Sequence, residues 1–219
     1  MRINIQNKDF FNKALQQILP ELSISEFTGI TIDSRKVEPG DIFLALKGEN
    51  TDGHEFIEQA HQGGASMALV EKITETSTPV FQVPSTRQFL NDLAIAHRKN
   101  LTCPLIGITG SNGKTTTKDL LSHVLSVSMN VMGTKGNFNS TIGVPLSIFE
   151  CSSETEIAII EMGASMPGEI EYICNIAQPN MGLITNIYEA HLEYFGDIEA
   201  VAKTKSALFS SLPESGTAF

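Results

Sequence analysis

Residues 110–115 have the types and the spacing that bind a phosphate group. The glycines Gly110 and Gly113 let the backbone curl so that several N–H groups converge, and Lys114 adds a positive charge beside them. Thr115 supplies a hydroxyl of the kind that binds Mg²⁺ next to a phosphate. The segment therefore predicts a site for ATP together with Mg²⁺. The predicted cofactor-binding residues are Gly110, Ser111, Asn112, Gly113, Lys114, Thr115 and Thr116.

The elements predicted on either side of this segment support the same interpretation. An apolar run at residues 105–108 indicates a buried strand, and the spacing of leucine and valine indicates a helix over residues 118–127. A glycine-rich turn between a strand and a helix N-terminus is a common binding place for phosphate groups. The general phosphate-loop pattern would place its first glycine at Ile108, whereas the glycines here are Gly107 and Gly110. The loop is therefore a variant of that pattern.

Three further residues lie where an ionisable group can assist a phosphate site. Glu161 ends an apolar run, and an acidic residue at a neighbouring strand end is the usual second anchor for Mg²⁺, although a carboxylate there can also cap a turn. His191 follows another predicted strand, but a lone histidine is often only a packed or solvent-facing residue. Lys205 lies on a predicted helix with an apolar face, which by itself favours a surface lysine.

Three polar clusters beside other predicted strands offer candidate contacts to a substrate. One is a glycine-rich loop at residues 134–145, whose amide groups can reach hydroxyls or phosphates. The other two lie in the first hundred residues, and one of them contains Arg35, a residue type that holds a phosphate with two hydrogen bonds. Each cluster is also typical of ordinary turns and caps. The candidate substrate-binding residues are Ser34, Arg35, Asp52, Gly53, His54, Asn137 and Asn139.

The composition of the chain excludes several classes of protein. The chain has 219 residues, 41% of them hydrophobic, which suits one or two globular domains. Its net charge of −10, without a cluster of lysine and arginine, argues against a nucleic-acid partner. The N-terminal segment lacks a signal-peptide core, and no apolar run approaches the roughly twenty residues that span a bilayer. Three widely spaced cysteines indicate a reducing compartment, so we expect a soluble protein of the cytoplasm.

The alternation of strand-like and helix-like segments predicts an α/β fold in two parts. The predicted strands are at residues 30–33, 41–45, 67–70, 80–83, 105–108, 130–132, 157–161 and 181–184. The predicted helices are at residues 8–19, 54–62, 87–98 and 118–127. In the second part, apolar strands between helices indicate a parallel sheet covered on both faces. Ligands bind at the carboxyl ends of such strands, where Thr109, Glu161 and residues 185–191 lie.

The last residues predict that the second part is incomplete. Residues 216–218 have the pattern of one more strand, after which the sequence stops. A sheet of four strands and a partial fifth would leave an open edge and an uncovered face. We therefore expect the chain to be a fragment of a longer protein, with a truncated second domain.

Together, the residue strings around these candidates resemble the Mur ligase family of peptidoglycan synthesis. The resemblance covers nearly the whole chain. The strings Gly136-Asn137-Phe-Asn139 with Gly143-Val-Pro145-Leu146, and Glu161-Met-Gly163-Ala, favour the branch that adds D-alanyl-D-alanine over those that add diamino acids. The other matching strings are Ile32-Asp33-Ser34-Arg35, Pro39-Gly40-Asp41-Ile-Phe43, Asp52-Gly53-His54-Glu-Phe56, Thr109-Gly-Ser-Asn-Gly-Lys-Thr-Thr116, Gly168-Glu169-Ile170, Thr185-Asn186 and Ala190-His191-Leu192-Glu193.

This resemblance implies a reaction and a domain plan. ATP would phosphorylate the C-terminal carboxylate of UDP-N-acetylmuramoyl-tripeptide, and the amine of D-Ala-D-Ala would attack the acyl phosphate to form a peptide bond. Residues 1–84 would form a small α/β domain that binds the UDP substrate, and residues 85–100 a connecting helix. Residues 101–219 would form an incomplete ATP-binding central domain with a P-loop and a parallel sheet.

The resemblance also implies roles for individual residues. Lys114, His191 and Lys205 would be catalytic residues. Thr115 and Glu161 would hold a first Mg²⁺, and His191 would help to hold a second one. Lys205 matches the family's carbamylated lysine, and it would become a metal ligand only after its amine reacts with CO₂, because an ammonium group cannot bind a metal.

Two positions depart from the family's usual pattern. Lys205 is followed by Ser206 and Ala207 where glycine and glutamate are usual, and Asn139 is followed by Ser140 where a second asparagine is common. The alternatives are another Mur-type ligase with a different amino-acid substrate, or a nucleotide- or UDP-sugar-binding module without ligase activity. A ligase of this kind needs a third domain that closes over ATP, so we expect this 219-residue piece to be inactive alone. We also expect the protein to be a monomer.

Overall fold

The computed structural model describes residues 2–5, 7–22, 27–48, 50–73, 75–190 and 192–219. It has the α/β fold that the sequence predicts, in two compact units at residues 1–97 and 98–219. The division falls inside helix α3 (Thr86–Asn100). Within the described residues, each unit contains a sheet of five strands. No helix in this part of the chain is long and apolar enough to cross a membrane.

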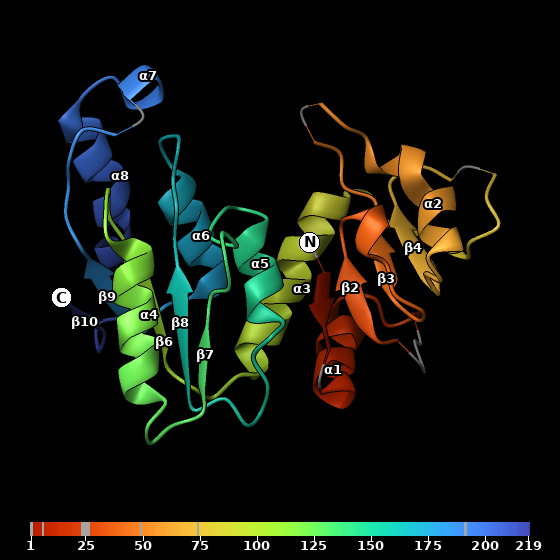
Figure 1. Ribbon diagram of the computed structural model, residues 1–219, viewed down its shortest axis with the longest axis horizontal. Helices are drawn as coiled ribbons and strands as arrows, with labels where there is room; N and C mark the ends of the chain where they lie inside the picture. The colour runs from red at the N-terminus through yellow and green to blue at the C-terminus, as the bar shows by residue number, and fades with distance from the viewer. Residues whose placement is uncertain (1, 6, 23–26, 49, 74, 191) are drawn as a thin grey trace. The chain divides into compact units, whose positions relative to one another are not determined.

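The sheet of the first unit has the strand order β1-β2-β3-β4-β5 (Figure 1). Strand β1 pairs antiparallel with β2, whereas β2 to β5 are parallel. The strands are β1 (Arg2–Asn4), β2 (Gly29–Thr31), β3 (Ile42–Leu44), β4 (Met67–Val70) and β5 (Val80–Gln82). Besides α3, the unit contains α1 (Lys8–Ile18), α2 (Ile57–Gln62) and the 3-10 turns η1 (Ser34–Lys36) and η2 (Gly53–Phe56).

In the first unit, helices pack against apolar residues of the strands and contact one another through aromatic rings. Phe43 and Ala68 belong to a buried cluster that includes Ile57 of α2. The ring of Phe10 on α1 meets His97 on α3 edge-on, with the ring centroids 4.9 Å apart. The turns η1 and η2 follow β2 and β3 in the chain, past the carboxyl ends of two neighbouring parallel strands.

The sheet of the second unit is parallel throughout and has the strand order β10-β9-β6-β8-β7. Its strands are β6 (Leu105–Thr109), β7 (Val131–Gly133), β8 (Ile157–Glu161), β9 (Met181–Ile184) and β10 (Thr217–Ala218). Its helices are α4 (Lys114–Leu125), α5 (Gly143–Ile148), α6 (Glu169–Ala177), α7 (Leu192–Phe195) and α8 (Ile198–Ser210).

The two faces of this sheet are covered by different helices. Ile106 and Ile108 point toward α4, where they pack with Leu121 in one apolar cluster. The residue between them, Gly107, faces the opposite side and lies against Leu208 of α8. Figure 1 shows α4, in green, on the near side of the sheet. The phosphate loop therefore connects the central strand β6 to a helix that packs on the same apolar cluster through Leu121 and Leu125.

Three elements differ from the sequence predictions. Helix α4 begins at Lys114 rather than at residue 118, because its first turn is polar and carries no apolar period, while Gly113 with φ +80° ends the loop. Helix α5 begins inside the segment predicted as a loop, which ends at residue 145, and continues to Ile148; all of its residues are buried. Strand β1, which the sequence does not predict, is only three residues long.

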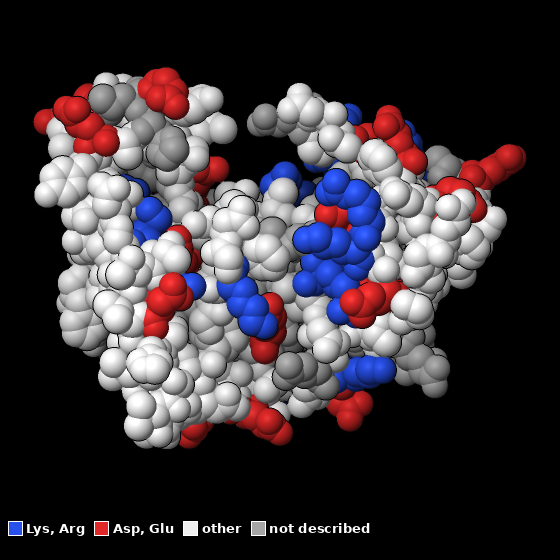
Figure 2. Space-filling view, in the orientation of Figure 1, with Lys and Arg blue, Asp and Glu red and all other residues white. Residues whose placement is uncertain are grey.

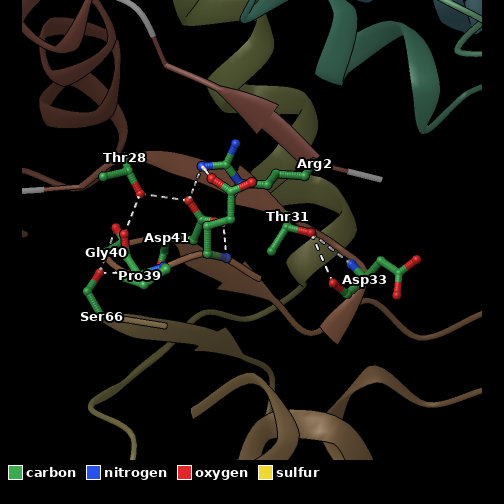
Figure 3. Close-up of polar contacts among 9 residues, drawn as sticks. Arg2, Thr28, Thr31, Asp33, Pro39, Gly40, Asp41 and Ser66 are labelled. Atoms are coloured by element: carbon green, nitrogen blue, oxygen red, sulfur yellow. Dashed lines mark hydrogen bonds and ion pairs between the residues drawn. The ribbon is translucent and has the colours of Figure 1, made fainter. Parts of the chain in front are cut away.

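A buried carboxylate fixes strand β1 at the edge of the first sheet. The side chain of Asp41 is fully buried and accepts hydrogen bonds from Arg2 Nε at 2.7 Å and Arg2 Nη2 at 2.9 Å. It also accepts from Thr28 Oγ1 at 2.8 Å and from the backbone N–H of Glu38 at 2.9 Å. Figure 3 shows the carboxylate between Arg2 and Thr28. Each carboxylate oxygen is thus satisfied, as a buried charge requires.

We expect Asp41→Ala to lower the free energy of unfolding by about 3 kcal/mol, because it removes the buried acceptor of hydrogen bonds from Arg2, Thr28 and the Glu38 N–H. Urea unfolding monitored by circular dichroism measures the change. The matched control is Glu38→Ala, which removes a second carboxylate at 3.0 Å from Arg2 whose side chain is 64% exposed. That control should cost less than about 1 kcal/mol, and equal losses in the two variants would contradict the interpretation.

Candidate nucleotide-binding site

The carboxyl ends of β6, β8 and β9 bring the predicted phosphate loop together with Glu161 and the loop after β9. Within the phosphate loop, Gly110 and Gly113 have φ angles of +147° and +80°, which side chains rarely adopt. A Cβ on Gly110 would also overlap the hydroxyl of Thr185. Both glycines are therefore required by the path of the loop.

Lys114 and the first turn of α4 provide the positive charge of the loop. The Nζ of Lys114 donates to the carbonyl oxygens of Gly110 at 2.7 Å and Ser111 at 3.3 Å, so the ammonium group lies over the loop. The first amides of a helix have no partner within the helix and carry a partial positive charge. The first amide that closes a helical bond onto Gly113 is that of Thr117. The amides of the three residues before it, including that of Thr115, belong to the first turn of α4 and would be available to a phosphate.

The geometry at Glu161 suits a divalent cation. Glu161 is 2% exposed, its Oε1 accepts from Asn139 Nδ2 at 2.8 Å, and its Oε2 is buried with no hydrogen-bond partner among the described residues. A buried carboxylate oxygen without a partner is costly, and a Mg²⁺ ion would satisfy it. Among the described residues, no group of three or more histidine, cysteine or acidic side chains is placed to hold a metal ion. Thr115, the other residue that the sequence predicts as a ligand of this ion, lies in the first turn of α4.

A buried chain of hydrogen bonds positions Glu161. Its backbone N–H donates to Thr134 Oγ1 at 3.0 Å, and the carbonyl of Thr134 accepts from Lys118 Nζ at 2.7 Å. Thr134 and Lys118 are both buried. The sequence does not show that Lys118 is part of this chain of hydrogen bonds, because a buried lysine on a helix has the same spacing as an exposed one.

Lys205 lies near Lys114, contrary to the surface position that its helix by itself favours. Helix α8 packs closely because Gly107 of β6 and Gly182 of β9 lack side chains where Leu208 contacts the sheet. Lys205, one turn before Leu208, is 4% exposed. Burial, and after it the positive charge of Lys114, lower the pKa of Lys205 to about 8. The other predicted catalytic residue, His191, lies outside the described residues.

In the first unit, the predicted substrate residues Ser34 and Arg35 lie on η1. Ser34 Oγ donates to Gln59 Oε1 at 2.7 Å. Arg35 forms two hydrogen bonds with Asp33, at 2.8 and 3.0 Å, and its side chain is 77% exposed. This guanidinium group holds the pKa of Asp33 well below its usual range. Figure 2 shows lysine and arginine side chains gathered on the visible face of the first unit.

The second cluster of the first unit has contacts within the fold. Asp52 caps η2 and accepts from the backbone N–H of His54 at 3.0 Å. The ring of His54 is buried, with Nδ1 at 2.6 Å from Asp52 and Nε2 accepting from the N–H of Glu71 at 2.8 Å. Gly53 packs so closely on Leu46 that a Cβ would lie 2.7 Å from its carbonyl oxygen. In the second unit, Asn137 is exposed on the loop before α5.

A strand, a glycine loop and a helix N-terminus at the centre of a parallel sheet are typical of nucleotide-binding α/β proteins, and comparison with known proteins identifies the family of this chain. The model of the Mur ligase middle domain matches residues 108–219, about half of the chain. The model of the Mur ligase family catalytic domain matches residues 26–98. The chain therefore belongs to the Mur ligase family.

Individual relatives show which members of the family the chain is similar to. The UDP-N-acetylmuramoyl-tripeptide–D-alanyl-D-alanine ligase of Escherichia coli (strain K12) is 40% identical over 189 residues, which are 86% of this chain and 42% of the relative. A MurF crystal structure from Acinetobacter baumannii is 35% identical with a TM-score of 0.86, covering 100% of this chain and 48% of that one. The MurF ligase of Thermotoga maritima, solved in complex with ADP, is 39% identical with a TM-score of 0.78, covering 86% and 44%. The chain thus spans less than half the length of these relatives.

The lowered pKa of Lys205 predicts a pH dependence of stability. The folded pKa of about 8 lies below the ordinary value of 10.5, so between these values the unfolded chain binds more protons than the folded chain. Stability from this group therefore rises as the pH increases from about 8. We expect Lys205→Met to be more stable than the unmodified chain at pH 7, with the difference shrinking toward pH 10. Urea unfolding of both proteins at four pH values tests this, and a constant difference would contradict it.

Proposed function

We propose that the chain is the substrate- and ATP-binding part of an ATP-dependent ligase that joins UDP-N-acetylmuramoyl-tripeptide to D-Ala-D-Ala. The observation that carries the proposal is the buried Oε2 of Glu161, which has no hydrogen-bond partner among the described residues and lies at the same sheet edge as the phosphate loop. The name of the E. coli relative supports the choice of substrates, and the ADP in the T. maritima structure supports the choice of nucleotide.

The proposed reaction has two steps. The carboxylate at the end of the tripeptide attacks the γ-phosphorus of ATP, which forms an acyl phosphate and releases ADP. The amine of D-Ala-D-Ala then attacks the carbonyl carbon, which forms the amide bond and releases inorganic phosphate and a proton. Bound Mg²⁺ would reduce the negative charge that repels the attacking carboxylate.

The residues of the second unit can serve the first step. Lys114 and the first amides of α4 would hold the β- and γ-phosphates and stabilise the charge that develops during transfer. Glu161 and Thr115 would hold the ion, and Asn139 would keep the Glu161 carboxylate in place through its hydrogen bond. Because these groups are attached to strand ends and to one helix, little reorganisation would accompany the reaction.

Lys205 is proposed to act as a carbamate. A neutral amine can attack CO₂ and lose a proton to give a carbamate, whose oxygens bind a metal as a carboxylate does. The pKa of about 8 leaves a larger neutral fraction near neutral pH than an ordinary lysine has. Together with His191, this group would hold a second Mg²⁺.

The first unit is proposed to bind the UDP part of the substrate. Its exposed positive charge supports this, since the chain as a whole has a net charge of −10. Arg35 is the main candidate because its guanidinium group is exposed and already held by Asp33. The domain limits at residues 84 and 101 remain a prediction. We also propose that the protein works as a cytoplasmic monomer without nucleic acid. Its three buried cysteine thiols, none of them in a disulfide, suit a reducing compartment.

Two alternatives are separated from this proposal by substrate dependence. A Mur-type ligase for another amino acid would form ADP with a different amine, and a binding module without ligase activity would form none. ADP release that requires both UDP-N-acetylmuramoyl-tripeptide and D-Ala-D-Ala, measured on a protein of the relatives' full length, distinguishes the three.

We expect Glu161→Gln to remove most of the dependence of nucleotide binding on Mg²⁺, because the amide lacks the charge that attracts the ion. Calorimetry gives the affinity for ATP with Mg²⁺ and with EDTA, and the ratio of the two should fall by about tenfold or more in the variant. The control is Glu171→Gln, the same substitution at an exposed carboxylate on α6. A ratio unchanged in Glu161→Gln would contradict the metal site.

We expect Arg35→Ala to weaken binding of UDP-N-acetylmuramoyl-tripeptide by about tenfold, the loss typical of a hydrogen-bonded charge contact to a phosphate. Lys36→Ala is the matched control, because Lys36 is the neighbouring exposed cation on the same turn. Calorimetric titration of both variants measures the effect. Equal losses of affinity in the two variants would mean that the positive charge of this turn attracts the ligand non-specifically and that Arg35 is not a specific contact.

A further inference from the structure

The loop after β9, here called the β9 loop (residues 185–188), holds the backbone of the phosphate loop at several points. We infer that Asn186 and Thr185 are positioning residues that set the peptide orientations of the phosphate loop before a nucleotide binds. This inference rests on the proposed function, because it concerns the same nucleotide site. It assigns a role to two residues that are not among the proposed ligands of the cation, Glu161 and Thr115.

Asn186 binds two consecutive residues of the phosphate loop. Its side-chain Oδ1 accepts from the N–H of Asn112 at 2.9 Å, and its Nδ2 donates to the carbonyl of Asn112 at 3.1 Å. Its backbone carbonyl accepts from the N–H of Ser111 at 3.0 Å. Beyond the end of β6, the phosphate loop no longer pairs with a neighbouring strand. Asn186 provides hydrogen-bond partners for its backbone instead.

These bonds determine which way the neighbouring groups point. In a trans peptide the C=O and the following N–H point in opposite directions. The carbonyl of Asn112 is turned toward the β9 loop, so the N–H of Gly113 is turned away from it. In the two peptides before, the N–H groups of Ser111 and Asn112 are turned toward the β9 loop, and the carbonyls of Gly110 and Ser111 face Lys114 Nζ at 2.7 and 3.3 Å.

Thr185 completes the contact through its hydroxyl. Its Oγ1 donates to the carbonyl of Asn112 at 2.6 Å, which gives that oxygen two donors. The same hydroxyl lies where a Cβ of residue 110 would be, so only glycine allows Thr185 to approach. A third contact joins Ser111 to the backbone of Tyr188, since Ser111 Oγ donates to its carbonyl and accepts from its N–H, both at 2.9 Å.

The contacts with Asn186 determine which backbone amides of the phosphate loop are available to a phosphate. The N–H groups of Ser111 and Asn112 are bound to Asn186. The backbone donors that remain available to a phosphate therefore begin at Gly113 and continue into the first turn of α4. The contact is also neutral, which matters because a carboxylate in place of the Asn186 amide would repel the phosphates. The β9 loop therefore prepares the site without adding negative charge to it.

The test compares substitutions that remove single contacts. Thr185→Val keeps the shape of the side chain but removes the donor to Asn112, whereas Thr185→Ser keeps the hydroxyl. Asn186→Ala removes both side-chain bonds to Asn112. Ser126→Ala is the control, because Ser126 Oγ donates to the His123 carbonyl at the far end of α4. The affinity for Mg·ATP is measured by calorimetry, and thermal unfolding is measured on the same samples.

We expect Thr185→Val to weaken Mg·ATP binding by about tenfold and Asn186→Ala by more, with Thr185→Ser within about twofold of the unmodified chain. Amide hydrogen exchange in the nucleotide-free chain provides a second readout. The Asn112 amide should be protected, and Asn186→Ala should release that protection while leaving the amides of strand β8 protected. A purely structural role would lower the unfolding temperature without changing the affinity of the folded fraction.

The two readouts separate this inference from the proposed function. Unchanged Mg·ATP affinity in Asn186→Ala would overturn the inference while leaving the nucleotide site in place, and so would an unprotected Asn112 amide in the unmodified chain. Failure of the unmodified chain to bind Mg·ATP would overturn the proposed function and, with it, the role of Asn186 in preparing the site.

Discussion

The close approach of two segments to the backbone of β6 is the constraint on which the rest of the site depends. Gly107 admits Leu208 of α8, and Gly110 admits the hydroxyl of Thr185. A side chain at either position would separate the central strand from helix α8 or from the β9 loop. The absence of two Cβ atoms therefore brings Lys205 close to Lys114 and holds the phosphate loop against the next strand.

The site concentrates charges that a stable core would avoid. Glu161 and Lys205 are both almost fully buried, Glu161 has one oxygen without a partner in the described residues, and the positive charge of Lys114 disfavours a second ammonium at Lys205. Burying charge in this way lowers stability, and proteins accept that cost where a ligand will complete the contacts. The apolar cluster around Ile106 and Ile108 offsets part of the cost. By contrast, the buried Asp41 of the first unit is fully paired and has a structural role.

The regular elements of the second unit could be predicted because each is apolar in the pattern of its own structure. Strands β8 and β9 have the predicted limits, since each is a short apolar run bounded by polar residues. The first turn of α4 and helix α5 could not be placed in this way. The former is polar, and the latter looks like a glycine-rich turn although the fold buries it. Strand β1 depends on Asp41, which lies far from it in the sequence.

The sequence alone determined the phosphate loop, the α/β fold and the family resemblance, because these depend on residue types at short, regular spacing. Only the tertiary structure decided the environment of each candidate: the burial of Lys205, the unpartnered oxygen of Glu161 and the contacts of Asn186. The physical reason is that burial and hydrogen-bond partners come from segments distant in the chain. Asn186 and Asn112 are separated by most of the second unit, and no local pattern records that they meet.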